Sequence, residues 1–324
     1  MENTLEYIQQ EIEEMIDNQK EFTEVGHYTG IDVLESIANN YKKSDDKDNI
    51  VLWASSVYNT NDSKEMHSGY DYVVGAFGDF ETCLEGKVEN KFRISTYLQD
   101  ANNSEKYKHC SEERFINWMI QQDNTPYFIS FTKLIDNLDM WIKPYGKNGK
   151  GVCLVFDIEG LKKLHRPSGM FIHGPVSVVY GERLGHLKTK NLFQKMVLYT
   201  FLDFIKQVYR LTNLDEIIEC KIQAIDQICN IISAYIKDEG WHPEREVRLV
   251  AAQHHYPMGE VPIIKYKDEE QKIPYIEIKI PTFCLKKIFV GSQVGKKELK
   301  IVKECANILG LSPDNIIISK TPLQ

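Results

Sequence analysis

The sequence lacks the short motifs that mark several common enzyme classes. It has no G-x-S-x-G nucleophile elbow, no G-x-x-x-x-G-K-[ST] phosphate loop and no G-x-G-x-x-G dinucleotide fingerprint. Metal-ligand spacing is also missing, because no H-E-x-x-H occurs and the adjacent His254 and His255 would point to opposite sides of a strand. These absences weaken the corresponding hydrolase, nucleotide-binding and zinc-enzyme hypotheses, and they predict no metal site.

Cysteine pairs and long apolar runs are missing as well. The seven cysteines form no C-x-x-C pair, which is typical of isolated thiols in a reducing compartment and argues against a structural zinc site. No basic and apolar leader precedes residue 25, and no run approaches the roughly 20 apolar residues that a membrane helix needs. The sequence therefore predicts a cytoplasmic protein with no membrane partner.

Basic residues are outnumbered, since the formal net charge is -8. Acidic side chains concentrate in residues 1–24, where they face only Lys20. Non-specific contact with phosphates needs clustered lysine and arginine, so the balance gives no strong nucleic-acid signal. Lys143, Lys147 and Lys150 could form a local basic groove, although three lysines in one loop are more often plain surface.

The order of expected elements indicates one α+β domain over residues 1–324. Helical spacing of apolar residues predicts helices over 1–24 (acidic and amphipathic), 33–37, 62–77, 139–145 and 299–309, and the segment 84–123 is mixed but helical in character. Short apolar runs predict strands at 50–54, 127–132, 151–157, 176–180, 276–280, 288–291 and 316–318. Residues 191–238 predict a long helical hairpin inserted into the domain. Strands from both ends of the chain favour a single mixed central sheet.

The most informative stretch is Trp241 to Val250. Pro243 interrupts any helix arriving from upstream, and the residues after it alternate as in a strand. Two sets of side chains would then face opposite ways: Val247 and Leu249 on one side, and Glu244, Glu246 and Arg248 on the other. Such a strand either exposes a solvated face or lines a polar cleft, in which Arg248 would pair with one of the two glutamates.

Two further clusters favour the cleft: Gly26-His27-Tyr28-Thr29 near the start, and Tyr127 to Thr132 between that cluster and the late strand. Cleavage of an N-glycosidic bond passes through an oxocarbenium-like state, which a nearby carboxylate stabilises. An imidazole can hydrogen-bond ribose hydroxyls, and aromatic rings can stack on a departing nicotinamide. The residues that would supply such a set are His27, Glu246 and one of Tyr28, Tyr127 or Phe131.

The sequence resembles an uncharacterised bacterial family, domain of unknown function 2971, along most of its length. The features that carry the resemblance are, in order, His27-Tyr28-Thr29, Asn61-Asp62 with Glu65, Ser130-Phe131-Thr132, Met140-Trp141 with Tyr145 and Gly151, Trp241 with Glu244, Glu246 and Arg248, and Val290-Gly291. Each motif is short, so the order and spacing carry the match. Where the family has Asn-Asp-Pro, this chain has Asn61-Asp62-Ser63. The family itself implies no function.

A second, remote resemblance does imply one. His27 and the late glutamate look like the His-Tyr-Glu pattern of ADP-ribosyltransferases, and Glu244-x-Glu246 is similar to the paired glutamates of their arginine-modifying branch. That resemblance implies an ADP-ribosyltransferase-like fold with NAD as substrate, in which Glu246 would contact the nicotinamide ribose and Glu244 would help the acceptor. The branch begins with arginine where this chain has His27, its Ser-Thr-Ser strand is matched only loosely by Ser130-Phe131-Thr132, and no tyrosine equivalent is identified.

The leading hypothesis is an NAD-dependent ADP-ribosyltransferase or NAD glycohydrolase that acts as a bacterial toxin or anti-phage defence effector, with an unidentified acceptor. Its catalytic residues would be Glu246, Glu244 and His27, and the nucleotide would contact His27, Tyr28, Thr29, Ser130, Phe131, Trp141, Tyr145 and Arg248. The alternative is a non-catalytic module that senses a nucleotide in a defence system, and a nuclease is a third hypothesis. His27 could equally cap or pack, and Trp141, Tyr145 and Trp241 are also typical of core aromatics.

Overall fold

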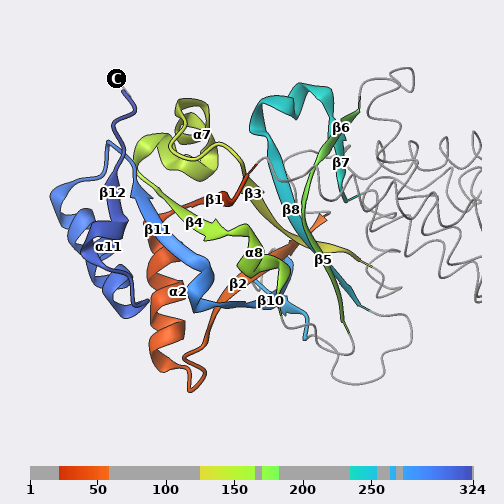
Figure 1. Cartoon of the computed structure of the whole chain (residues 1–324), viewed down its shortest axis with the longest axis horizontal. Coiled ribbons are helices and arrows are strands. Elements are labelled where there is room, and N and C mark those ends of the chain that lie inside the picture. The colour runs from red at the N-terminus through yellow and green to blue at the C-terminus, as the bar shows by residue number, and fades with distance from the viewer. Residues whose placement is uncertain are drawn as a thin grey trace, which may run out of the picture.

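The computed structural model describes residues 22–57, 125–164, 170–181, 234–253, 263–267 and 273–322 (Figure 1). Several predicted features lie outside these residues: nearly all of the acidic helix over 1–24, the helix over 62–77 with the preceding turn, the segment 84–123 and most of the hairpin over 191–238. Glu24 is the first residue of a strand. No helix among the described residues is long and apolar enough to cross a membrane.

One mixed sheet organises the described residues. Its ten strands run in the order β12-β11-β4-β1-β3-β2-β10-β9, with β8 beside β3 and β5 beside β8. The strands are β1 (Glu24–Thr29), β2 (Asn49–Ser56), β3 (Tyr127–Thr132), β4 (Val152–Asp157), β5 (Met170–Ser177), β8 (Glu246–Gln253), β9 (Lys265–Tyr266), β10 (Pro274–Pro281), β11 (Leu285–Val290) and β12 (Ile316–Ile318). β11 and β12 are parallel, whereas β1, β3 and β8 pair antiparallel. The predicted α+β fold with a mixed central sheet is confirmed.

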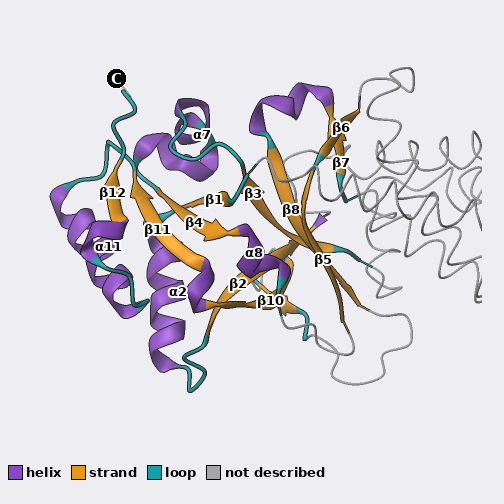
Figure 2. Cartoon of the chain, viewed as in Figure 1, coloured by secondary structure: helices purple, strands orange, loops and turns teal. Residues whose placement is uncertain are grey.

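Two long helices pack against each other and against the sheet, as Figure 2 shows. They are α2 (Ile31–Lys43) and α11 (Lys296–Ile308), and they confirm the helices predicted around 33–37 and 299–309. Apolar residues recur every three or four positions, so each helix buries one face. The buried residues are Leu34, Ile37 and Ala38 in α2, and Val302, Cys305 and Ala306 in α11. They meet alternate residues of the strands, such as Ile50 and Leu52 of β2, in the main core.

The predicted strands are confirmed except for the run at 176–180. That run divides between β5 and β6 (Val179–Gly181), and β6 pairs in parallel with β7 (Ile236–Asp238) in a separate two-stranded sheet. The ladder between β5 and β8 ends at Val178, whose N–H donates to the carbonyl oxygen of Glu246 in register with the preceding pairs. The prediction of a single strand at 176–180 is therefore wrong.

The main sheet divides along β3. The first residues of β3 pair with β2, through Phe128 opposite Ser55, and its last residue, Thr132, pairs with Gly26 of β1. In the described pairing, residues 129–131 have no partner in either strand, whereas the other edge of β3 pairs with β8 along its whole length. Strands β1 and β2 therefore separate from each other over the middle of β3. We call this feature the sheet split.

A 3-10 helix at Glu239–Glu244 precedes β8 and contains Pro243. Arg245 then adopts a left-handed conformation with φ 43°, and the strand begins at Glu246. The predicted alternation is confirmed, because Val247 and Leu249 lie in the main core and Arg248 points the other way.

The helix predicted over 139–145 is divided. Asn137 caps α7 (Leu138–Ile142) by accepting hydrogen bonds from the N–H groups of Asp139 and Met140, and a 3-10 helix begins at Pro144. The second helix, Pro144–Gly149, carries Tyr145. The end of α7 just before Pro144 confirms the prediction that proline stops the α-helix.

Candidate functional site

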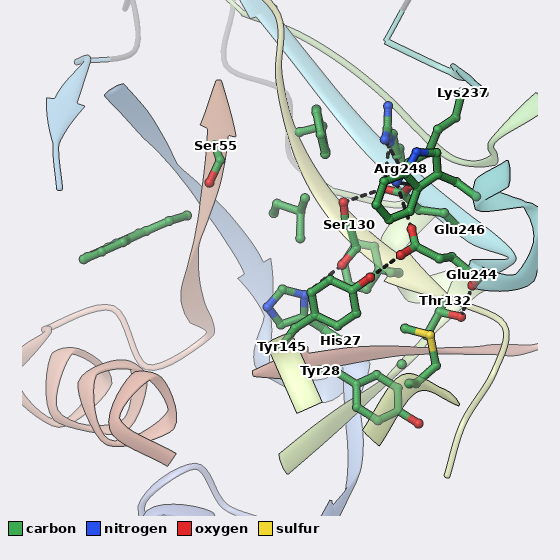
Figure 3. A pocket seen from close by; sticks show the side chains of 17 residues that line it. His27, Tyr28, Ser55, Ser130, Thr132, Tyr145, Lys237, Glu244, Glu246 and Arg248 are labelled. Atoms are coloured by element: carbon green, nitrogen blue, oxygen red, sulfur yellow. Dashed lines mark hydrogen bonds and ion pairs between the residues drawn. The ribbon is translucent and has the colours of Figure 1, made fainter. Parts of the chain in front are cut away.

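A pocket of about 310 Å³ lies at the sheet split (Figure 3). Strands β1, β2, β3 and β8 contribute Gly26, His27, Tyr28, Trp53, Ser55, Phe128, Ile129, Ser130, Phe131, Thr132, Glu246 and Arg248 to its lining. Strand β7 adds Lys237, and the helical segments add Met140, Tyr145, Trp241 and Glu244. Its volume is at the lower end of the range for ligand sites, about 300–1,000 Å³, so it can enclose a small ligand or part of a larger one.

Glu246 is buried and fully engaged by neighbouring donors. Its Oε1 accepts from Ser130 Oγ at 2.5 Å and from Arg248 Nε at 2.8 Å, and its Oε2 accepts from Arg248 and Lys237, each at 3.0 Å. Burial acts to raise the pKa of Glu246, but the charges of Arg248 and Lys237 with these hydrogen bonds outweigh it and hold the pKa at about 2. Glu246 is therefore an ionised carboxylate in a fixed orientation.

Arg248 is held as firmly as the carboxylate it pairs with. Its guanidinium donates to the carbonyl oxygen of Ala234 at 2.5 Å and lies 4.1 Å from the ring centroid of Phe128. Only 1% of the residue is exposed. A planar guanidinium with both a carboxylate and an aromatic face beside it is well suited to such burial.

Glu244 forms a second charged centre beside the first. Its carboxylate accepts from Lys143 at 2.5 Å, from Lys237 at 2.8 Å and from the Tyr145 hydroxyl. Burial opposes ionisation, yet the two ammonium groups and the hydroxyl lower the pKa of Glu244 below its usual value. The pKa of Tyr145 is raised, by burial first and then by Glu244, so its hydroxyl stays protonated as a donor.

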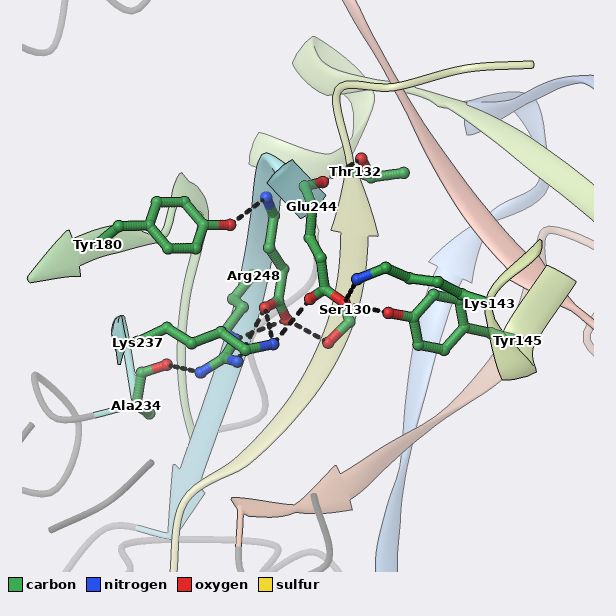
Figure 4. Close-up of polar contacts among 10 residues, drawn as sticks. Ser130, Thr132, Lys143, Tyr145, Tyr180, Ala234, Lys237, Glu244 and Arg248 are labelled. Atoms are coloured by element: carbon green, nitrogen blue, oxygen red, sulfur yellow. Dashed lines mark hydrogen bonds and ion pairs between the residues drawn. The ribbon is translucent and has the colours of Figure 1, made fainter. Parts of the chain in front are cut away.

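Lys237 connects the two carboxylates, because its ammonium donates to both Glu244 and Glu246 (Figure 4). It also lies 4.8 Å from the centroid of the Trp241 ring, and Lys143 lies 5.1 Å from the same ring. The side chains thus form an alternating chain of charge: Lys143, Glu244, Lys237, Glu246 and Arg248. Because cations exceed carboxylates by one, this cluster carries a net positive charge.

His27 reaches the pocket from β1. Its Nδ1 lies 2.8 Å from the carbonyl oxygen of Ser130, a group in the part of β3 that faces the sheet split. A carbonyl only accepts, so Nδ1 carries the proton and Nε2 is an acceptor in the neutral ring. Burial lowers the pKa of His27, which favours that neutral form. Among the described residues Nε2 has no hydrogen-bond partner, and Figure 3 shows it on the side of the ring that points away from Ser130.

Most of the residues predicted for the site come together. His27, Tyr28, Ser130, Phe131, Tyr145, Glu244, Glu246 and Arg248 all line the pocket. Thr29 and Trp141 do not line it. Trp141 is fully buried, donates from its indole nitrogen to Asp136 and packs edge-on against Tyr28, so it supports the wall from behind.

Sequence reasoning missed several contributors. Lys237 belongs to the segment predicted as a helical hairpin, but residues 236–238 form strand β7, so the prediction is wrong there. Lys143 was predicted only as part of a basic groove or of the plain surface. Trp241, typical of a core residue, is only partly buried and lines the pocket with Lys237. Tyr180 was also missed, and its hydroxyl accepts the N–H of Glu246 at 2.7 Å. Lysines and acidic residues occur near Trp241, but no pattern in the sequence predicts which of them lie side by side.

Among the residues that the structure describes, no group of three or more His, Cys, Asp and Glu side chains is placed to hold a metal ion. The carboxylates of the pocket are each bonded to lysine or arginine. The described residues of the pocket supply fixed charges, hydroxyls and an imidazole.

Fold and site together define an α+β protein with a charged pocket at a split in a mixed sheet. Residues 140–249 match the family described as "Protein of unknown function (DUF2971)", which confirms the predicted resemblance over that segment. The match includes Tyr145, Lys237, Glu244, Glu246 and Arg248, but not the part of the site on β1, β2 and β3. The comparisons with curated proteins and with solved structures gave no match.

Proposed function

We propose that the chain binds NAD in this pocket and cleaves the bond between nicotinamide and ribose, with transfer of ADP-ribose to an acceptor or to water. The observation that carries the proposal is the meeting of His27, Ser130 and Glu246 from three adjacent strands, β1, β3 and β8, at the sheet split. An imidazole, a hydroxyl and an ionised carboxylate are thereby fixed around one cavity.

The proposed reaction places a positive charge at the ribose carbon that loses nicotinamide. The C–N bond breaks and its electron pair leaves with nicotinamide, so the ribose passes through an oxocarbenium-like state. A hydroxyl or amine of the acceptor then forms the new bond and gives up its proton. Glu246 supplies a negative charge fixed in advance by Ser130 and Arg248, and such preorganised electrostatics stabilise the state.

His27 would orient the ribose. Its Nε2 is a lone-pair acceptor at the pocket surface, and a ribose hydroxyl is a matching donor. Glu244, held by Lys143 and Tyr145, is the candidate group to receive a proton from the acceptor. By analogy with other NAD-cleaving proteins, such an activity suits a bacterial toxin or an anti-phage effector.

Nicotinamide release from NAD tests the proposal directly. Wild-type protein should release nicotinamide, measured by liquid chromatography, and Glu246→Gln should reduce the rate at least about 100-fold. The matched control is Glu159→Gln, which changes an exposed glutamate on α8 (Ile158–Lys162) and should leave the rate unchanged. Ser130→Ala, which keeps the charge but removes one orienting hydroxyl, should give an intermediate rate.

Two results would contradict the proposal. One is a wild-type protein that releases no nicotinamide over hours. The other is a Glu246→Gln protein that melts cooperatively and cleaves NAD at the wild-type rate, because cooperative melting shows that the variant is folded.

The pairing of both glutamates favours a second candidate function, a non-catalytic module that binds a nucleotide. Each carboxylate already accepts from at least two charged or hydroxyl donors. A positive, preformed pocket of this kind can hold an anionic nucleotide without turning it over. Calorimetric titration with NAD and with cyclic nucleotides separates the two functions: tight binding with no product favours the module, and turnover favours the enzyme.

A further inference from the structure

Trp53 lies on β2, on the side of the sheet split opposite to His27 on β1. Alternate residues of β2, Ile50 among them, point into the main core, so Trp53 and Ser55 point to the other face. Both line the pocket, and 40% of Trp53 is exposed. The fold therefore presents a large aromatic surface to the pocket and does not bury it.

Tyr275 on the neighbouring strand fixes the orientation of that surface. The register places Tyr275 opposite Ser55, so Trp53 and Tyr275 are diagonal neighbours on one face of the sheet. Their rings stack with centroids 4.2 Å apart and planes at 24°. Tyr275 is 9% exposed and does not line the pocket, so the indole meets the pocket with surface that Tyr275 leaves uncovered.

Hydrogen-bonding groups lie beside the indole. Ser55, His27 and Ser130 all line the pocket, and Figure 3 shows Ser55 on a different strand from the other two. In the part of the chain that the structure describes, neither the Ser55 hydroxyl nor His27 Nε2 has a hydrogen-bond partner. The Trp53 ring could stack on the face of a heteroaromatic ring, and the Ser55 hydroxyl and His27 Nε2 could hydrogen-bond the polar atoms at the edge of that ring.

We propose that Trp53 is the stacking platform for a planar heteroaromatic ring of the nucleotide that occupies the pocket. The inference rests on the proposed function only in the choice of NAD as that nucleotide. Adenine and nicotinamide share the required chemistry, and the experiment below distinguishes them. Stacking on an aromatic side chain tolerates different rings, and its loss weakens nucleotide binding by about 5-fold to 100-fold.

Calorimetric affinities for AMP and for nicotinamide mononucleotide test the proposal. Trp53→Ala should weaken one of them by about 5-fold to 100-fold, and Trp53→Phe, which keeps a ring, should recover most of the loss. The control is Phe283→Ala, because Phe283 is 63% exposed and lies outside the pocket lining. It should bind both ligands like wild type.

A fluorescence measurement separates stacking from a structural role. The bound ring should quench indole emission in the wild type, and in Trp53→Phe, which keeps Trp241 in the pocket lining, the quenching should be smaller although binding persists. Loss of AMP affinity assigns the adenine, and loss of nicotinamide mononucleotide affinity assigns the nicotinamide. Unchanged affinity for both ligands in Trp53→Ala, or a wild type that binds neither, overturns the inference. None of these results depends on NAD cleavage, so a failure of the proposed reaction is recognised separately.

Discussion

The imidazole of His27 is fixed to the backbone of the adjacent strand, because its Nδ1 lies 2.8 Å from the carbonyl oxygen of Ser130. The side chain thereby satisfies a backbone group in the part of β3 that pairs with neither β1 nor β2. The same contact fixes the tautomer, with the proton on Nδ1 and the lone pair on Nε2. One interaction thus satisfies a backbone carbonyl at the sheet split and orients the acceptor that the proposed function uses.

The pH dependence of stability should report this buried imidazole. Burial lowers the pKa of His27 from 6.5, so the unfolded chain binds more protons than the folded chain below pH 6.5. The unfolding free energy should therefore decrease as the pH falls below 6.5. His27→Asn keeps an N–H near the Nδ1 position and does not titrate. Urea unfolding between about pH 7 and pH 5 should therefore give a smaller decrease in unfolding free energy for this variant than for wild type.

The control for that experiment is His242→Asn, which changes an exposed histidine. Its unfolding free energy should follow the wild-type pH dependence. Identical pH dependence in wild type and in His27→Asn would show that His27 is not held in its neutral form by the fold.

The ion pair between Glu246 and Arg248 should couple strongly in a double-mutant cycle. Glu246→Gln leaves the buried Arg248 without its carboxylate, and Arg248→Met leaves the buried Glu246 with Lys237 alone, so each should lower the unfolding free energy by about 3–5 kcal/mol. The double variant should lose less than the sum of the two. The exposed pair Lys265 and Glu277 is the matched control, and its coupling should stay below about 1 kcal/mol. Additive effects at Glu246 and Arg248 would contradict the contact.

Acid should remove the stabilisation that the ionised Glu246 carboxylate provides. The pKa of Glu246 is about 2 in the folded protein, below the usual 4.5, so its charge stabilises the fold above 4.5. That stabilisation is lost as the pH falls from about 4.5 to about 2. In Glu246→Gln this part of the acid transition should be missing, as followed by circular dichroism.

The strands and helices of the core were predictable because each depends on a local pattern. Alternation at 247–249 and helical spacing at 299–309 follow from burial of one face, and burial is what the structure shows. The run at 176–180 was mispredicted because it divides between two partners that are distant in sequence, β8 for residues 176–178 and β7 for residues 179–181. No local pattern contains that information.

The site was predictable in its imidazole, carboxylates and arginine, and not in its lysines. His27, Glu244 and Glu246 stand out because they interrupt strand patterns, whereas Lys143 and Lys237 look like surface lysines in any sequence window. Their positions depend on the register of β7 and of the 3-10 helix at Pro144–Gly149, both of which are set by tertiary contacts. The split itself depends on where β1 and β2 stop pairing with β3.

The packing of the 3-10 helix that carries Tyr145 should depend on Gly291, which is distant in sequence. A Cβ on Gly291 would lie 2.1 Å from the carbonyl oxygen of Gly149, the last residue of the 3-10 helix that carries Tyr145. Gly291→Ala should therefore lower the unfolding free energy by about 1–3 kcal/mol, measured by urea titration. At Gly240 the nearest atom is the Asp238 side chain at 3.1 Å, and Gly240→Ala should change stability by less than about 0.5 kcal/mol. Equal effects would show that the backbone contact is not tight.

Lys237 should control the preference of the pocket for ligand charge. Its ammonium bridges Glu244 and Glu246, so it occupies the position in which the cationic ring of oxidised NAD would be attracted by the two carboxylates. Lys237→Met removes that competing cation and leaves Lys143 on Glu244 and Arg248 on Glu246. We therefore expect the affinity ratio of oxidised to reduced NAD, measured by calorimetry, to rise by about 3-fold to 10-fold.

Lys147→Met is the control for this change of charge. Lys147 lies on the same 3-10 helix as Tyr145 but is exposed and outside the pocket lining. Removing its charge should leave the ratio near that of wild type, because exposed charges are screened by solvent. A ratio that rises equally in both variants would mean that only the net charge of the protein matters. A ratio that falls in Lys237→Met would place the nicotinamide away from the two carboxylates.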